Sequence, residues 1–145
     1  MKYTVIIDKN REEEVVVYLR EPSEIADKIE RLVMSENAEL IGYGEGRIIP
    51  LAHGEIYAVY IEDGKLYASA EKEKLRLYER LYELEEKLGD GFVKINQSCI
   101  VNIKKIERFE VSAGGSLIVW MKNCYKDYVS RRQLKIVKER IGFRL

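Results

Sequence analysis

The chain has 145 residues, which suits one domain or one small domain with an extension, and its 46% hydrophobic and 34% charged residues favour an ordered globular protein. No segment reaches the roughly 18 apolar residues of a membrane-spanning helix, and the N-terminus does not resemble a signal peptide, so we expect a cytoplasmic protein without membrane insertion. The formal net charge is zero, but residues 91–145 carry twelve Lys and Arg against four acidic residues, which is typical of a surface that binds a polyanion. A solvated basic surface, balanced by the acidic residues 1–90, is the alternative.

The beginning of the chain predicts a β-β-α unit. Residues 3–8 and 15–19 are rich in Val, Ile and Tyr and predict two strands joined by a polar turn. A helix is predicted to begin after Pro22 and to end near Asn37, because apolar residues recur there at helical spacing.

We therefore expect two units, an N-terminal extension over residues 1–37 and a second domain over residues 38–145. The extension has too few elements to cover both faces of its own sheet, so we expect it to mediate dimerisation. Packing back onto the second domain is the alternative. The segment that ends at Asp8 is similar to the first strand of a phosphate-accepting receiver domain, but too few residues follow for such a domain, so phosphorylation of Asp8 is not expected.

Residues 39–91 predict two hairpins and a helix. The strands are expected at residues 40–43, 47–51, 56–61 and 65–69. The turns between them, around Gly44-Glu45-Gly46 and Glu62-Asp63-Gly64, suit hairpins. Leucines at helical spacing then predict a helix over residues 73–88, which we expect to pack on a sheet because it spans too few heptads for a dimer zipper.

The remaining chain predicts five more strands and a final helix. The strands are expected at residues 92–95, 99–103, 106–111, 117–121 and 125–129. Leu134, Val137 and Ile141 lie at helical spacing and predict a helix over residues 131–141. The expected fold class is mainly β, α+β overall, with packed antiparallel sheets, one or two short helices and the β-β-α extension before them.

Few residues suit catalysis. The lone His53 has no Cys near it for a zinc site, and we expect a surface turn histidine. The glycines of residues 42–46 precede a strand, whereas a phosphate-binding loop precedes a helix. Cys99 and Cys124 are expected to be a reduced pair, with a disulfide as the alternative. We therefore expect no enzyme activity, no metal and no cofactor.

Several motifs between Ile48 and Ile141 match one known family in order. They are Ile49-Pro50-Leu51, Glu55-Ile56-Tyr57, Tyr60-Ile61-Glu62, the helical segment 81–86, the segment 92–102, Ile106 and Tyr128-Val129-Ser130-Arg131-Arg132. On these motifs, about two-thirds of the chain resembles the LytTR family of bacterial DNA-binding domains. The resemblance implies a fold of packed antiparallel sheets in which loops and turns, not a recognition helix, enter successive major grooves.

The resemblance also implies which residues contact DNA. Gln97 and Arg132 are its strongest positions, followed by the turn at Lys65 and Leu66. Their chemistry agrees, because amides pair with adenine edges and arginine pairs with guanine or phosphate, while lysines neutralise the backbone. The expected DNA-binding residues are Lys65, Lys94, Asn96, Gln97, Ser98, Lys104, Lys105, Arg131 and Arg132. As alternatives, Ser98 only caps a turn and one of the two arginines faces protein.

The sequence departs from the family pattern at three positions. The family often has a histidine where Asn96 stands and an aromatic residue where Cys99 stands, a difference that would change which bases are contacted. It usually has a glycine where Cys124 stands, and the replacement should cost only a little turn strain.

These observations predict a short transcriptional regulator without a receiver domain. We expect it to bind paired promoter sites in double-stranded DNA as a homodimer, to bend the DNA, and to respond to its own abundance or to a regulatory protein partner. The alternative is a protein-interaction adaptor that has the same fold without affinity for DNA.

Overall fold

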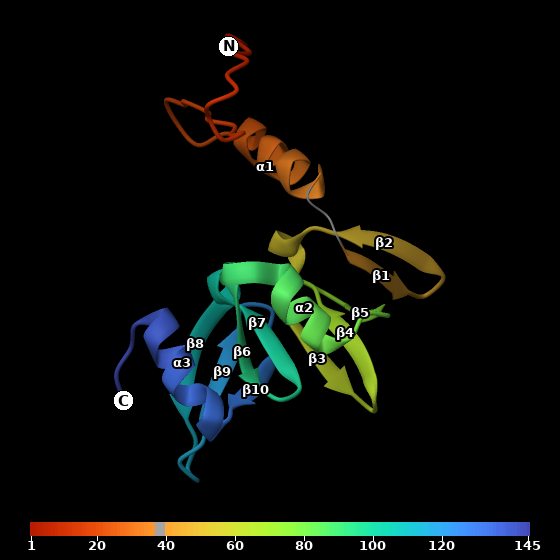
Figure 1. The fold of residues 1–145 in the computed structure, drawn as a ribbon, viewed down its shortest axis with the longest axis vertical. Helices are drawn as coiled ribbons and strands as arrows, with labels where there is room; N and C mark the ends of the chain where they lie inside the picture. The colour runs from red at the N-terminus through yellow and green to blue at the C-terminus, as the bar shows by residue number, and fades with distance from the viewer. Residues whose placement is uncertain (37–39) are drawn as a thin grey trace.

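A computed structural model of the chain describes residues 1–36 and 40–145, whose strands gather into two antiparallel sheets (Figure 1). The strands are β1 Leu40–Gly44, β2 Arg47–Leu51, β3 Ala58–Glu62, β4 Lys65–Ser69, β5 Lys74–Leu77, β6 Phe92–Asn96, β7 Cys99–Asn102, β8 Ile106–Val111, β9 Leu117–Met121 and β10 Lys126–Val129. The helices are α1 Glu24–Glu36, α2 Leu81–Leu88 and α3 Arg131–Ile141, with 3-10 turns at His53–Glu55, Gly89–Gly91 and Ile103–Lys105. The predicted boundary between residues 37 and 38 lies outside the described residues.

The larger sheet has seven strands in the order β2-β1-β5-β4-β3-β7-β6, and the smaller sheet has the order β10-β9-β8. The β1–β2 turn has φ of +44° at Glu45 and +74° at Gly46, and the β3–β4 turn has +51° at Asp63 and +75° at Gly64. Two successive residues with positive φ form the tight turn whose twist matches antiparallel strands. Both predicted hairpins are confirmed.

Two hydrophobic cores hold the sheets and helices together. In the first core, α2 lays Leu84 and Leu88 against buried residues of the larger sheet such as Leu77. In the second core, residues of β6 and β7 pack against the smaller sheet and α3. Its fully buried members include Ile95, Val101, Val119, Met121 and Val137. The mainly β fold class is confirmed, and so is the helix over residues 131–141.

The helix predicted over residues 73–88 is wrong in its first half. Residues 74–77 form β5, which pairs with β4 on one side and β1 on the other. Leu75 and Leu77 are buried, whereas Lys74 and Arg76, which alternate with them along the chain, are more exposed. The segment therefore has the two-residue period of a strand. The backbone N–H and C=O groups of this segment form hydrogen bonds with two neighbouring strands. It is therefore a strand, although its leucines also lie at helical spacing.

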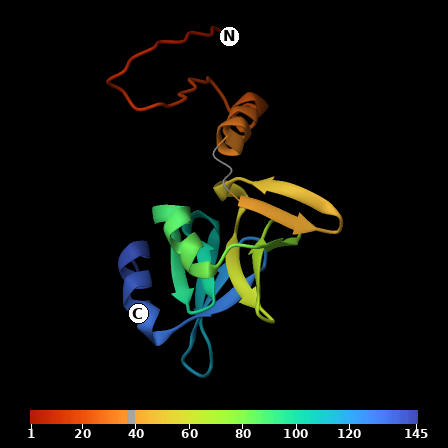
Figure 2. The same ribbon diagram turned by 45° about the vertical axis from the view of Figure 1, so that its right-hand side comes forward.

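In the N-terminal extension the helix is confirmed and the two strands are wrong. Residues 1–23, all of them described, contain no strand. A strand needs a partner for its backbone groups, and most apolar side chains of this segment are exposed: Tyr3 is 89% exposed, Ile7 90% and Tyr18 93%. Figures 1 and 2 show residues 1–36 standing apart from the two sheets.

The two cysteines are both free thiols in the structure. Cys99 lies at the start of β7 with no exposed surface, whereas Cys124 is exposed in the turn before β10. The disulfide alternative is not formed, and the expected reduced state agrees with the separate environments of the two residues.

Candidate nucleic-acid interface

Three turns that are far apart in the sequence meet at one edge of the molecule. They are the β3–β4 turn at residues 62–65, the β6–β7 turn at residues 97–98 and the β10–α3 junction at residues 130–132, and we call them the three-turn edge. Two backbone hydrogen bonds fix their proximity. The Ile61 N–H donates to the Ser98 carbonyl at 2.9 Å, and the Ser130 N–H donates to the Ile95 carbonyl at 2.8 Å.

Five of the predicted contact residues are exposed on this edge, and Ser98 in the second turn is one of them. Lys65 begins β4 beside the first turn, Gln97 forms the second turn, and Arg131 and Arg132 begin α3 at the third. The side chains of Lys65, Gln97, Arg131 and Arg132 make no hydrogen bond or ion pair with the described residues. They are therefore available to a ligand outside the chain.

The β10–α3 junction is held by a helix cap. The Ser130 hydroxyl accepts a hydrogen bond from the Gln133 N–H at 3.3 Å, as an N-cap residue does. The first turn of α3 contains no acidic residue and begins with Arg131 and Arg132 instead. Positive charge at a helix N-terminus opposes the helix dipole, so these two arginines lower helix stability where they stand.

Asn96, one of the predicted DNA-contacting residues, is buried in this fold, and its contact with DNA stays a prediction. Its side chain is only 2% exposed. Its amide nitrogen donates to the carboxylate of Asp127 at 3.2 Å and to the carbonyl of Tyr128 at 2.9 Å, and its oxygen accepts from the Ser98 N–H at 2.8 Å. Because buried polar groups need such partners, Asn96 serves to tie the β6–β7 turn to β10. Ser98 itself is exposed.

A chain of buried and partly buried polar groups continues behind Asn96. The Tyr125 hydroxyl donates to Asp127 at 2.9 Å and lies 3.6 Å from the sulfur of Cys99, and its ring stacks on Tyr60 with centroids 4.7 Å apart. Burial raises the pKa of the Cys99 thiol and of the Tyr125 phenol, and it raises the pKa of Tyr60 to about 12. The three groups are therefore neutral near pH 7 and support the edge without adding negative charge.

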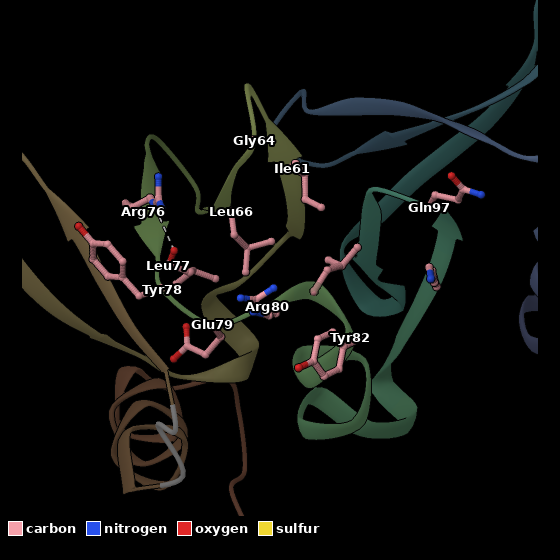
Figure 3. A pocket seen from close by; sticks show the side chains of 12 residues that line it. Ile61, Gly64, Leu66, Arg76, Leu77, Tyr78, Glu79, Arg80, Tyr82 and Gln97 are labelled. Carbon is pink, nitrogen blue, oxygen red and sulfur yellow. Dashed lines mark hydrogen bonds between the residues drawn. The ribbon is translucent and has the colours of Figure 1, made fainter.

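Lys94 lies on β6 next to the three-turn edge. Its side chain is 27% exposed, and its Nζ is 3.8 Å from a carboxylate oxygen of Glu85 on α2. Lys94 and Gln97 both line a groove of about 600 Å³ that opens between β3–β5 and the start of α2 (Figure 3). Lys94 is thus brought close to the edge, although it is not on it.

Lys104 and Lys105 are not brought together with the other predicted residues. They lie in the 3-10 turn that follows β7, whereas Gln97 and Ser98 precede the same strand. The Nζ of Lys105 sits 5.1 Å above the ring of Tyr57. A contact between these two lysines and DNA stays a prediction.

Sequence reasoning missed two basic residues of the groove, Arg76 and Arg80. The helix predicted over residues 73–88 placed both on a helix surface. In the structure Arg76 lies on β5 and Arg80 immediately precedes α2, and both line the groove beside Lys94. The alternation of Lys74, Leu75, Arg76 and Leu77 is the signal that would have revealed the strand.

The described residues contain no cluster of His, Cys, Asp and Glu suited to a metal ion. His53 lies in a 3-10 turn with its ring edge-on to Phe92, at a centroid distance of 6.2 Å. Over the described ranges, no helix has both the length and the apolar character to cross a membrane.

The chain is similar to proteins that are named as transcriptional regulators. An uncharacterized HTH-type transcriptional regulator of Staphylococcus aureus (strain NCTC 8325 / PS 47) is 28% identical over 147 residues, covering 98% of this chain and 99% of that protein. A second such regulator, from strain MSSA476, is 30% identical over 109 residues, covering 75% of this chain and 74% of that protein.

The fold has a counterpart among solved structures. The LytTr DNA-binding domain of a putative methyl-accepting/DNA response regulator from Bacillus cereus superposes with a TM-score of 0.66 and 23% identity, covering 72% of this chain and 96% of that chain. The family model of the LytTr DNA-binding domain matches residues 46–142, which include every strand from β2 onward and all three turns of the edge. The chain therefore belongs to the LytTR family.

Proposed function

We propose that this protein is a transcriptional regulator that binds double-stranded DNA through the three-turn edge. The observation that carries the proposal is that the fold brings Lys65, Gln97, Arg131 and Arg132 from three distant segments to one edge, with their side chains exposed. Turns with amide and guanidinium groups can enter the major groove and pair with base edges. The matched family and the names of the relatives support DNA as the ligand.

Each residue has a distinct role in this proposal. Gln97 pairs with an adenine edge, and Arg132 pairs with a guanine edge. Lys65 and Arg131 contact phosphates and fix the position of the turns on the duplex. Ser98 is exposed beside Gln97 and donates from its hydroxyl to a phosphate or base.

The arrangement on DNA is part of the same proposal. Two copies of the chain bind paired promoter sites and bend the DNA between them. The N-terminal extension, which leaves large apolar side chains exposed, provides the contact between the copies. The protein acts in the cytoplasm, where its DNA target lies.

Substitution of the two base-pairing residues tests this function. A cognate duplex is first selected from a random pool with the unaltered protein. Gln97→Ala and Arg132→Ala should then weaken binding to the cognate duplex by roughly 1–3 kcal/mol each and leave a scrambled duplex nearly unaffected. The matched control is Gln133→Ala, because Gln133 carries the same amide within α3.

If both variants lose affinity equally on cognate and scrambled duplexes, the base-pairing roles are wrong and the residues contact the backbone. If the unaltered protein selects no sequence and binds no duplex, the proposed function fails and the adaptor alternative replaces it.

A further inference from the structure

Both apolar and basic side chains line the groove beside the three-turn edge. Its volume is about 600 Å³, and its apolar lining includes Leu66, Leu77 and Leu81. The three cations that line it, Arg76, Arg80 and Lys94, come from β5, the residue before α2, and β6. Figure 3 shows the guanidinium of Arg80 in the middle of the groove, between the strand that carries Leu66 and the helical turn that carries Tyr82.

Two of these cations are held in place by the protein. The guanidinium of Arg76 lies 5.0 Å from the ring centroid of Tyr78, and its Nε donates to the Leu77 carbonyl at 3.0 Å. Lys94 is kept near the groove by its ion pair with Glu85. Arg80 is exposed, and its side chain makes no hydrogen bond or ion pair with the described residues, so its five N–H donors are free for a ligand.

The groove also has one acidic residue, Glu79. One of its carboxylate oxygens is buried and lacks a hydrogen-bond partner among the described residues. Three cations against one acid leave the lining positive. An anion is therefore the ligand that this charge pattern favours.

The position of the groove indicates which anion. Its rim includes Gly64 of the β3–β4 turn and Gln97 of the β6–β7 turn, so it joins two of the three turns proposed to enter DNA (Figure 3). Phosphates line the strand of duplex that passes from one inserted turn to the next. We infer that this groove receives the DNA backbone between the two turns, and that Arg80 and Lys94 contact its phosphates.

This inference rests on the proposed function and adds to it a sequence-independent contact surface outside the turns. Phosphate contacts position a protein on DNA and contribute equally on every sequence, whereas base contacts contribute on the cognate sequence alone. The two kinds of residue are therefore separable by experiment. The groove residues should affect all duplexes, and Gln97 and Arg132 should affect only the cognate duplex.

The test measures duplex affinity of the full chain across a range of salt concentrations. Arg80→Gln and Lys94→Gln should each weaken binding to cognate and scrambled duplexes by the same factor. Each should also reduce the slope of log affinity against log salt by about one unit, which makes the loss of affinity between 50 and 200 mM salt roughly three- to fourfold smaller. The matched control is Lys87→Gln, because Lys87 is exposed at the far end of α2 and does not line the groove.

A second variant changes the charge in the opposite direction. Glu79→Gln removes the acid from the groove and should strengthen binding to both duplexes. A misfolded variant would bind more weakly, so stronger binding cannot be explained by misfolding. The inference is overturned if the unaltered protein binds duplex and Arg80→Gln and Lys94→Gln have the same affinity and the same salt slope as the unaltered protein. That result is expected if the groove binds a small anionic ligand instead of DNA. Absence of duplex binding by the unaltered protein would instead refute the proposed function.

Discussion

Cys124 has a backbone conformation that suits glycine. Its φ is +72°, in the turn that joins β9 to β10. A residue with a side chain loses roughly 1–2 kcal/mol of stability in this left-handed region. Glycine avoids that loss, but it loses more conformational entropy on folding, so the net gain from glycine is smaller. Cys124→Gly should therefore raise the free energy of unfolding by about 0.5–1 kcal/mol, measured by urea denaturation. Cys124→Ala serves as the control and should show no gain; an equal gain in both variants would mean that the thiol, not the backbone, is unfavourable.

Tyr60 predicts how stability depends on alkaline pH. Burial raises its pKa from 10.0 to about 12 in the folded protein, so folding favours the neutral phenol. This contribution is complete below pH 10 and is lost as the pH rises from 10 towards 12. The unaltered protein should lose stability over this range more steeply than Tyr60→Phe, which has no phenol to ionise at this position. Parallel curves of unfolding free energy against pH for the two proteins would show that Tyr60 does not contribute.

Asn96 and Gln97 show what the sequence can predict at the residue scale. Both carry a carboxamide, and both lie in the motif that predicted DNA contacts. Only Gln97 is exposed, because Asn96 finds its hydrogen-bond partners in Asp127 and Tyr128, about thirty residues later in the chain. Local sequence carries no information on such distant partners, so the motif located the turn correctly but did not distinguish the exposed amide from the buried one.

At the element scale, the proposed DNA-binding role of the start of α3 comes with a cost in helix stability. Arg131 and Arg132 occupy a helix N-terminus, where acidic residues stabilise and basic residues destabilise. Arg132→Glu should therefore raise the free energy of unfolding by about 0.3–1 kcal/mol while it abolishes duplex binding. Thermal unfolding and a duplex titration on the same sample check both effects. A variant that loses stability and binding together would indicate that Arg132 has a structural role.

Strand and helix boundaries were predictable where one periodicity dominated. The strands from β6 to β10 and the helix α3 lie close to the predicted ranges, because strong alternation and clear turn residues mark them. Strand β5 was missed, since the leucines at 77, 81, 84 and 88 also fit a helix and only pairing with β1 and β4 decides between the two. Because of the same error, the sequence did not predict the groove. Arg76 and Arg80 line it together with Lys94 in a fold in which residues 74–77 form a strand.

At the scale of the whole molecule, residues 1–36 are the part that the fold leaves uncovered. Several of their large apolar side chains are exposed, among them Tyr3, Ile7 and Tyr18, and the views of Figures 1 and 2 agree that this segment stands apart from the sheets. We predict that it joins two copies of the chain, because burying this apolar surface is favourable and the acidic segment avoids phosphate. The full chain should therefore sediment as a dimer at micromolar concentration, and a chain that lacks residues 1–36 should be a monomer that still binds a single half-site.

A full-length chain that remains monomeric both on and off DNA would contradict the dimer. An insoluble shortened chain would support the alternative that the extension completes the core of the second domain. Neither result would alter the assignment of the three-turn edge, because its residues all lie between 62 and 132.

Salt dependence of duplex binding tests the central claim most directly, since that claim is that the three-turn edge binds DNA. The measurement titrates the full-length protein against its selected duplex and a scrambled duplex between 50 and 200 mM salt. Binding through phosphates and bases predicts that log affinity falls linearly with log salt on both duplexes, and that the selected duplex is preferred at every concentration. Absence of duplex binding even at 50 mM salt would contradict the claim and leave an adaptor that has the family fold without affinity for DNA.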